Sequence, residues 1–223
     1  MEKTKRSNKL LKVTLSVVAL ILVAAVTYGI TMAFLTAKSN DKTNVFTSGD
    51  NVDIIINEPK YDIAADHVFR PGDLQDKDPS VGNLKEEAYI AMTVEFYAKE
   101  PGAADYTGPM TYGDFKSQYA NIGIEKSGAF AAGEFSPQWF ASADNKDSAT
   151  KLVFYYKGDN DTDALKAVGK GGATEELFTK VKFNDDIATV VNAAAPEVRI
   201  DVKAYAVQTT GTGVTDLNDL MGI

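Results

Sequence analysis

The stretch that most constrains the fold is residues 88–98, AYIAMTVEFYA, in which side-chain character alternates from one position to the next. Successive side chains of an extended strand point to opposite faces, so every second residue shares a face. One of the two faces is uniformly apolar and should contact the core. It consists of Ile90, Met92, Val94, Phe96 and Ala98. The alternation therefore predicts a β-strand with one core-facing side.

Four further segments carry strand-like patterns separated by turn residues. They are residues 51–57, 121–126, 151–157 and 198–208. Residues 111–119 and 174–180 are predicted as short helices, and residues 101–109 as a loop rich in Gly and Pro. No strand–helix–strand alternation typical of a parallel α/β sheet occurs. We expect a mainly β chain, a jelly-roll-like antiparallel β-sandwich with short helical insertions.

The N-terminus has the organisation of a membrane-targeting segment. Residues 1–12 hold five bases and one acid, and residues 13–37 hold no charged side chain. A basic region followed by an apolar region is typical of a secretory signal, expected here as a hydrophobic helix over residues 1–33 with cleavage between Ala33 and Phe34. The uncharged run also exceeds the ~20 residues that cross a bilayer, so an uncleaved membrane anchor is the alternative.

Composition excludes several classes of site. The chain has no cysteine and one histidine, His67, so disulfides, thiolate nucleophiles, cysteine-ligated zinc and HExxH zinc sites are excluded. The net charge of −8 argues against nucleic-acid binding, which needs basic patches. No cofactor-binding motif is present, and we expect no enzymatic activity and no cofactor.

Two acidic clusters have the composition of metal sites. Asp159, Asp161 and Asp163 place oxygen ligands at every second position, as the start of a calcium-binding loop does, and are weak candidates for a metal site. However, Ala164 stands where such a loop needs Gly, and Lys170 where it needs Glu. A solvated acidic turn is the main interpretation. The same interpretation applies to the second cluster, which consists of Asp73, Asp76 and Asp78.

An ordered set of motifs resembles a known family. An Ala-Phe-Leu-Thr segment (residues 33–36) follows the hydrophobic run, and Asn44-Val45-Phe46-Thr47-Ser48-Gly49 follows a short polar stretch. Further along are Pro-Gly-Asp at residues 71–73, the segment at residues 77–83, and Tyr-Ala-Val-Gln at residues 205–208. Together these motifs resemble the TasA/camelysin family of secreted proteins, which are processed by an ER-type signal peptidase.

The resemblance implies a jelly-roll protein exported to the cell surface or the extracellular matrix. An acidic, cysteine-free exported protein fits the surface of a Gram-positive cell, where no disulfide machinery is needed. Relatives assemble into biofilm-matrix fibres in which the freed N-terminal segment of one subunit adds as a strand to the next. Strand addition satisfies the unpaired backbone groups of a sheet edge, and a head-to-tail interface that does not close grows a filament. In this chain the donor would be residues 34–47, anchored by Phe34, Leu35, Val45 and Phe46.

The expected organisation follows from this resemblance. Residues 1–33 would be the signal peptide, 34–50 the donor-strand segment, 51–210 the jelly-roll domain and 211–223 a C-terminal tail. The partners would be further copies of the chain in a head-to-tail homopolymer, the signal peptidase during export, and minor matrix subunits. The membrane would be contacted only through the signal segment before its cleavage.

Two other functions remain open from the sequence. The first is a membrane-anchored surface adhesin or binding module, which would keep its hydrophobic N-terminal segment. The second is a camelysin-like metallopeptidase, because some relatives have been classed as such. A single histidine and the lack of an HExxH motif give the peptidase interpretation no support.

Overall fold

The computed structural model describes residues 36–38, 46–48, 52–61, 71–187 and 196–209, which form a mainly β structure with antiparallel sheets. One short helix accompanies the strands in these residues. The strands are β1 (Thr36–Lys38), β2 (Phe46–Ser48), β3 (Val52–Asn57), β4 (Leu74–Asp76), β5 (Ser80–Asn83), β6 (Ala88–Lys99), β7 (Thr107–Met110), β8 (Ala120–Lys126), β9 (Ala129–Ala132), β10 (Trp139–Ala141), β11 (Lys151–Tyr156), β12 (Ala167–Val168), β13 (Lys180–Phe183) and β14 (Glu197–Gln208), and the helix α2 is Tyr112–Gln118.

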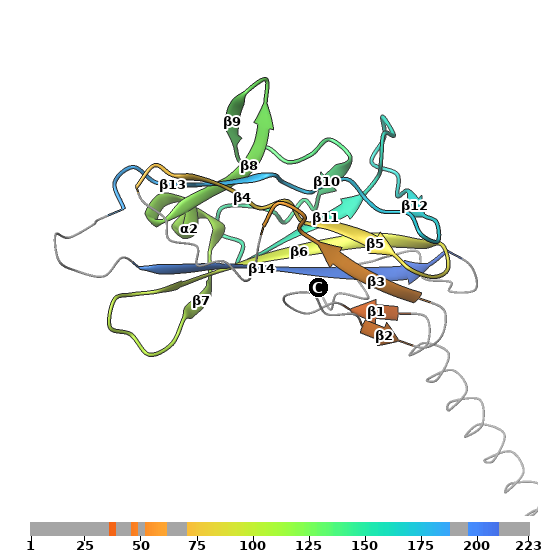
Figure 1. Ribbon diagram of the computed structural model, residues 1–223, viewed down its shortest axis with the longest axis horizontal. Helices are drawn as coiled ribbons and strands as arrows, with labels where there is room; N and C mark the ends of the chain where they lie inside the picture. Colours follow the sequence, from red (N-terminus) through yellow and green to blue (C-terminus); the bar gives the residue numbers. More distant parts are fainter. Residues whose placement is uncertain (1–35, 39–45, 49–51, 62–70, 188–195, 210–223) are drawn as a thin grey trace, which may run out of the picture.

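The largest sheet is built around the long strands β6 and β14, which run across the whole molecule (Figure 1). They pair antiparallel over twelve positions, from Glu197 opposite Lys99 to Gln208 opposite Ala88. The order of strands in this sheet is β1-β14-β6-β11-β10, and β12 and β7 pair with the two ends of β6. The predicted strand at residues 88–98 is confirmed, and it lies at the centre of the structure.

The apolar face of β6 forms the middle of the core, as its alternation predicts. Ile90, Met92, Val94 and Phe96 have no exposed surface. Val94 lies between Val202 of β14 and Leu152 of β11, which are also almost fully buried. The neighbouring strands thus place apolar side chains directly opposite Val94, and such cross-strand pairs stabilise an antiparallel sheet.

The opposite face of this sheet is also partly buried. Ala91 of β6 has no exposed surface and belongs to a second, smaller apolar cluster. The other buried members of that cluster are Val153, Tyr155, Tyr205 and Val207. The two faces of the sheet therefore bury two separate apolar clusters, which the sequence pattern did not predict.

A second layer covers the main core. The four-stranded sheet β4-β13-β8-β9 lies across β6 and β14 in Figure 1, and the three-stranded sheet β2-β3-β5 lies at one end. From α2, the ring of Phe115 stacks on Phe96 with 4.5 Å between ring centres. Thr111 caps this helix by accepting the N–H of Asp114 at 3.1 Å. Antiparallel sheets packed on a shared core are consistent with a β-sandwich.

The predicted helix at residues 174–180 is wrong, because the structure has no helix there. The N–H of Thr174 donates to the carbonyl of Val81, and the N–H of Val81 donates to the Thr174 hydroxyl, both at 2.9 Å. Leu177 continues this pairing by donating its N–H to the carbonyl of Pro79. Leu177 and Phe178 are both fully buried. Hydrogen bonds and burial along residues 79–81 thus outweigh the local helical pattern.

The predicted loop at residues 101–109 is also partly wrong, because its last residues belong to β7. This strand pairs with β6 through Ala98 opposite Thr107 and Phe96 opposite Met110, with a shift of register between the two pairs. The prediction failed because Gly and Pro in the segment are typical of loops, whereas an edge strand tolerates a proline.

Candidate functional site

The candidate site is the edge of the large sheet where the N-terminal segment joins it. β1 pairs antiparallel with the C-terminal end of β14, with Thr36 opposite Val207, Ala37 opposite Ala206 and Lys38 opposite Tyr205. β1 is the outermost strand on this side of the described sheet (Figure 1). A segment from the N-terminal region thus completes the sheet beside β14, the last strand in the described residues.

The two sides of β14 are paired very unequally. On one side β6 pairs with all twelve of its residues, whereas β1 pairs with three. A three-residue ladder contributes few hydrogen bonds, so β1 is held to the sheet far less strongly than β14 is.

The accepting strand is well fixed at the positions that β1 contacts. Ala206 has no exposed surface and belongs to the main core, while Tyr205 and Val207 belong to the second apolar cluster. Side chains on both faces of β14 are therefore anchored at this end of the strand. An edge fixed in this way presents its backbone groups in a constant geometry.

Of the predicted anchors of the donor segment, only Phe46 lies in the described residues. Phe46 begins β2, which pairs with β3 of the same chain through Phe46 opposite Ile54 and Ser48 opposite Val52. The other predicted anchors and the predicted cleavage site lie outside the described residues. They are Ala33, Phe34, Leu35 and Val45. The segment that reaches β14 is Thr36–Lys38, which lies inside the predicted donor range.

The acidic turn with the calcium-like spacing makes contacts within the protein. The Asp159 carboxylate accepts the Gln138 side-chain amide at 3.0 Å, and Asp163 forms an ion pair with Lys157 at 3.2 Å. Among the described residues no group of three or more His, Asp or Glu side chains is arranged to hold a metal ion. Asp159, Asp161 and Asp163 are therefore not arranged as such a group.

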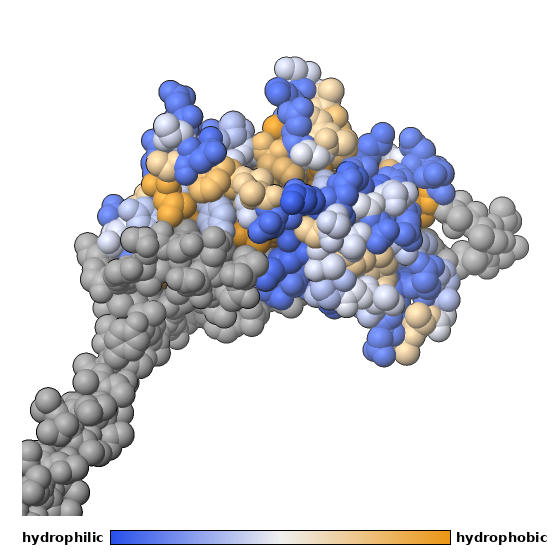
Figure 2. Space-filling model, turned by 180° about the vertical axis from the view of Figure 1, so that it is seen from behind, coloured by the Kyte–Doolittle hydropathy of each residue, from blue (hydrophilic) through white to orange (hydrophobic). Residues whose placement is uncertain are grey.

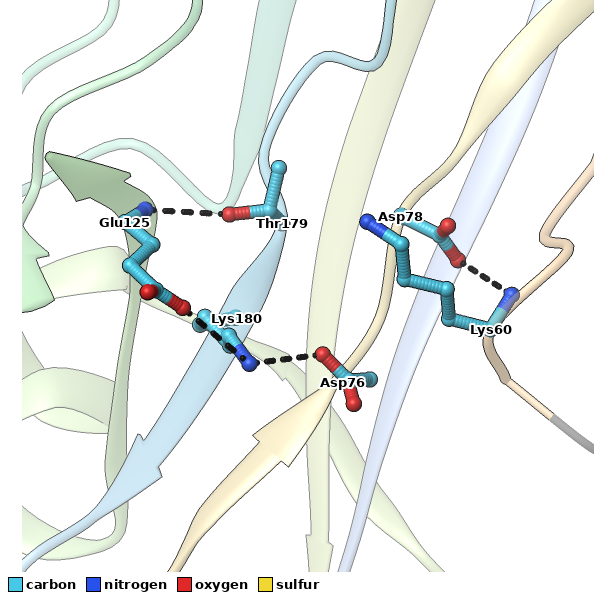
Figure 3. A network of polar contacts seen from close by, with 6 residues as sticks. All are labelled: Lys60, Asp76, Asp78, Glu125, Thr179 and Lys180. Atoms are coloured by element: carbon cyan, nitrogen blue, oxygen red, sulfur yellow. Dashed lines mark hydrogen bonds and ion pairs between the residues drawn. The ribbon is translucent and has the colours of Figure 1, made fainter. Parts of the chain in front are cut away.

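Two members of the second acidic cluster, Asp76 and Asp78, contact different residues of the protein (Figure 3). The Lys180 ammonium lies 2.7 Å from Asp76 and 3.4 Å from Glu125, so it joins β13 to the strands on either side. Asp78 lies apart from this pair, has no exposed surface, and accepts the backbone N–H of Lys60 at 3.1 Å. In the described residues its Oδ2 atom has no hydrogen-bond partner.

Asp78 makes the stability of the protein depend on pH. Burial raises the pKa of its carboxyl above the ordinary value of 3.8, although the Lys60 N–H opposes the shift. A carboxyl whose pKa is raised by folding binds its proton more tightly in the folded state. Its contribution to the free energy of unfolding therefore grows as the pH falls through the folded pKa, and levels off below 3.8.

We expect the Asp78→Asn variant to be more stable than the parent at neutral pH, because the amide keeps the Oδ1 acceptor and removes the buried charge. Its advantage should shrink as the pH is lowered. Urea unfolding of both proteins across the acid range measures this difference. An advantage that does not change with pH would contradict the assignment.

Several tyrosines join distant segments as hydrogen-bond donors. The Tyr119 hydroxyl donates to Glu100 at 2.6 Å, and burial, reinforced by this carboxylate, raises the pKa of Tyr119 to about 12. Burial and the Glu175 carboxylate likewise raise the pKa of Tyr156, whose hydroxyl donates to Glu175. These phenols stay protonated at physiological pH. The sequence did not reveal these contacts, since the partners are 19 residues apart.

The predicted signal peptide, residues 1–33, and His67 both lie outside the described residues. In the residues that the structure does describe, no helix has the length and apolar character needed to cross a bilayer. Comparisons of this chain with protein-family models, with characterised proteins and with solved structures give no match.

Proposed function

We propose that the chain is a secreted structural protein, a subunit of extracellular biofilm-matrix or cell-surface fibres that assemble by N-terminal strand addition. The observation that carries the proposal is the antiparallel pairing of β1 with the edge of β14. It supports strand addition because a segment from the N-terminal region already fits this edge in a defined register. The sequence motifs that resemble the TasA/camelysin family support the same function.

Assembly would exchange β1 between neighbouring subunits. In one subunit Thr36–Lys38 pairs with its own β14, and in a fibre the same residues of the next subunit would take the same register. Exchange of identical elements costs little free energy, because each pairing that is broken within a chain forms again between two chains. Since the donor and the acceptor are different surfaces, each added subunit offers a new acceptor and the filament grows.

The proposal includes a jelly-roll topology, a signal peptide over residues 1–33 and cleavage between Ala33 and Phe34. Cleavage matters mechanistically, because a segment that remains attached to a membrane helix is restricted in reaching a neighbouring subunit. The protein would then be secreted, and its partners would be further copies of itself, the signal peptidase during export and minor matrix subunits.

N-terminal sequencing and intact mass of the protein recovered from its native cell surface test the processing step. A chain that begins near Phe34 supports export with cleavage and frees the donor segment. A chain that begins at Met1 overturns the processing step and favours the membrane-anchored adhesin instead.

Deletion of residues 34–43 from the mature chain tests the assembly step, because it removes β1 and leaves β2–β14 intact. We expect a folded monomer that forms no filaments by electron microscopy, with circular dichroism to verify the fold. The matched control deletes the tail, residues 211–223, and should still polymerise. Normal filaments from the variant without residues 34–43 would rule out β1 as the donor.

A further inference from the structure

The hairpin formed by β8 and β9 projects from the four-stranded sheet (Figure 1). Lys126 and Ala129 are its closing pair, and the two turn residues, Ser127 and Gly128, have φ angles of 53° and 79°. Two residues with positive φ form the tight turn that best matches the twist of two paired strands. The hairpin is therefore locally well determined and holds β9 at the periphery of the protein.

The register determines where the backbone groups of β9 point. In an antiparallel pair, hydrogen-bonded and non-hydrogen-bonded positions alternate. The closing residue Ala129 is bonded to β8, and the N–H of Gly133 donates to the carbonyl of Ile122 at 2.8 Å. Positions 129, 131 and 133 therefore face β8, and the N–H and C=O groups of Phe130 and Ala132 point away from it.

These outward groups belong to an edge strand without protective features. β9 is the terminal strand of the four-stranded sheet in the described residues. Its sequence, AFAA, contains no charge and no proline, the residues that commonly protect natural sheet edges from pairing. Ala129 and Ala132 are exposed and Phe130 is half-buried. In Figure 2 the projecting part of the molecule accordingly carries apolar colours beside hydrophilic ones.

We propose that β9 pairs antiparallel with β9 of a second copy of this chain about a two-fold axis, with Ala131 opposite the partner subunit's Ala131. In this register Phe130 of one copy lies opposite the partner subunit's Ala132. The outward N–H and C=O groups of both residues then form hydrogen bonds across the axis. It also places the ring of Phe130 beside a small alanine side chain of the partner. Registers centred on Phe130 or Ala132 would leave part of these groups without a strand partner.

The charged side chains nearest β9 are paired with each other within one chain. Lys126 and Glu134 form an ion pair at 3.1 Å, and their side chains are 67% and 53% exposed. This ion pair leaves neither charge without a partner beside β9.

The result would be one continuous sheet in which β4-β13-β8-β9 of one copy is followed by β9-β8-β13-β4 of the other. Few backbone hydrogen bonds hold it, so a single interface is expected to be weak. The proposal does not depend on the fibre function. If the chain does polymerise, repeated weak contacts between filaments would reinforce one another and join filaments side by side.

Cysteine cross-linking on the full chain tests the register, because the chain has no cysteine of its own. In the A131C variant the two cysteines would face each other at a non-hydrogen-bonded position, where Cα atoms lie about 4.5 Å apart, within disulfide range. The control, A129C, is on the same strand and face, but its two copies would lie roughly 13 Å apart. We expect A131C to form disulfide-linked dimers under mild oxidation at least tenfold faster than A129C.

Equal or slower cross-linking of A131C overturns the proposal, and so does a pattern in which neither variant cross-links. The A132P variant provides a second readout without cysteine, because it removes one outward N–H and none that faces β8. Sedimentation of the otherwise unmodified chain should show a lower dimer fraction for A132P than for A129S, and an unchanged fraction would again contradict the interface.

The two proposals can fail separately. A chain that lacks residues 34–43 should keep the A131C cross-link even though it makes no filaments. Conversely, filaments of the A132P variant should form normally but remain single in electron micrographs. If deletion of residues 34–43 abolished the cross-link, the β9 contact would require the fibre. That result would overturn the inference that the contact forms independently of fibre assembly.

Discussion

The Val94→Asp variant is expected to lose on the order of 4 kcal/mol of stability and to be largely unfolded at physiological temperature. Val94 is fully buried at the centre of β6, with Val202 and Leu152 beside it on the two neighbouring strands. A carboxylate at this position would have no hydrogen-bond donor and no cation within the apolar core. Thermal unfolding followed by circular dichroism measures the loss directly.

Two variants separate the effect of charge from that of shape. Val94→Thr has nearly the same shape and should lose much less, because a hydroxyl is cheaper to bury than a carboxylate. Val198→Asp introduces the same group near the end of β14, where the side chain is only half-buried, and should also be milder. A melting temperature of Val94→Asp equal to that of the parent would show that this face of β6 does not meet the core.

The Asn83→Asp variant is expected to have an effect nearly as large, about 3 kcal/mol, although it changes one NH₂ group into an oxygen. Asn83 has no exposed surface, and its amide nitrogen donates to the carbonyls of Glu86 and Val168, both at 2.7 Å. Its amide oxygen accepts the N–H of Lys85 at 3.2 Å. A carboxylate would direct a negative oxygen at two carbonyl oxygens.

The destabilisation of Asn83→Asp should be strongest at neutral pH and partly relieved in acid, because a protonated carboxyl donates one hydrogen bond again. Urea denaturation at neutral and acid pH measures both values. The control is Asn83→Leu, which also removes the hydrogen bonds but should show no such relief. A destabilisation of Asn83→Asp that is the same at both pH values would contradict the role of the buried charge.

The long strands could be predicted because their own sequences contain the signal. The alternation at residues 88–98 identifies β6 and its core face, and residues 198–208 identify β14 in the same way. Each strand is long enough for the period of two to stand out from chance. The helix α2 was also predicted, since Phe115 and Tyr119 are spaced one helical turn apart.

The short elements could not be predicted, because their conformation is imposed by distant residues. The segment around Thr174 is extended only because it bonds to Val81, 93 residues away. The four-residue strands β9 and β13 offer too few positions for a period to appear. Their formation depends on β8, which lies between them and pairs with both.

The strand that pairs with the N-terminal segment could not be predicted from the sequence. The resemblance implies a donor segment at residues 34–47, and Thr36–Lys38, which lie within this range, pair with β14 of the same chain. The sequence did not reveal that β14 would be the accepting strand, because pairing between the two ends of a chain leaves no local pattern. Nor did it single out β9, whose position at an edge depends on the whole order of strands.

The order of strands also has a consequence for the time at which the fold can form. β14, the last strand in the described residues, lies between β1 and β6 rather than at an edge. Contacts such as that of Lys203 with Glu95 join residues 108 positions apart. Until β14 emerges, β6 has no partner along one entire side, and so the large sheet cannot close. Proteins dominated by such distant contacts fold slowly, and the large sheet cannot form before residues 197–208 have been synthesised.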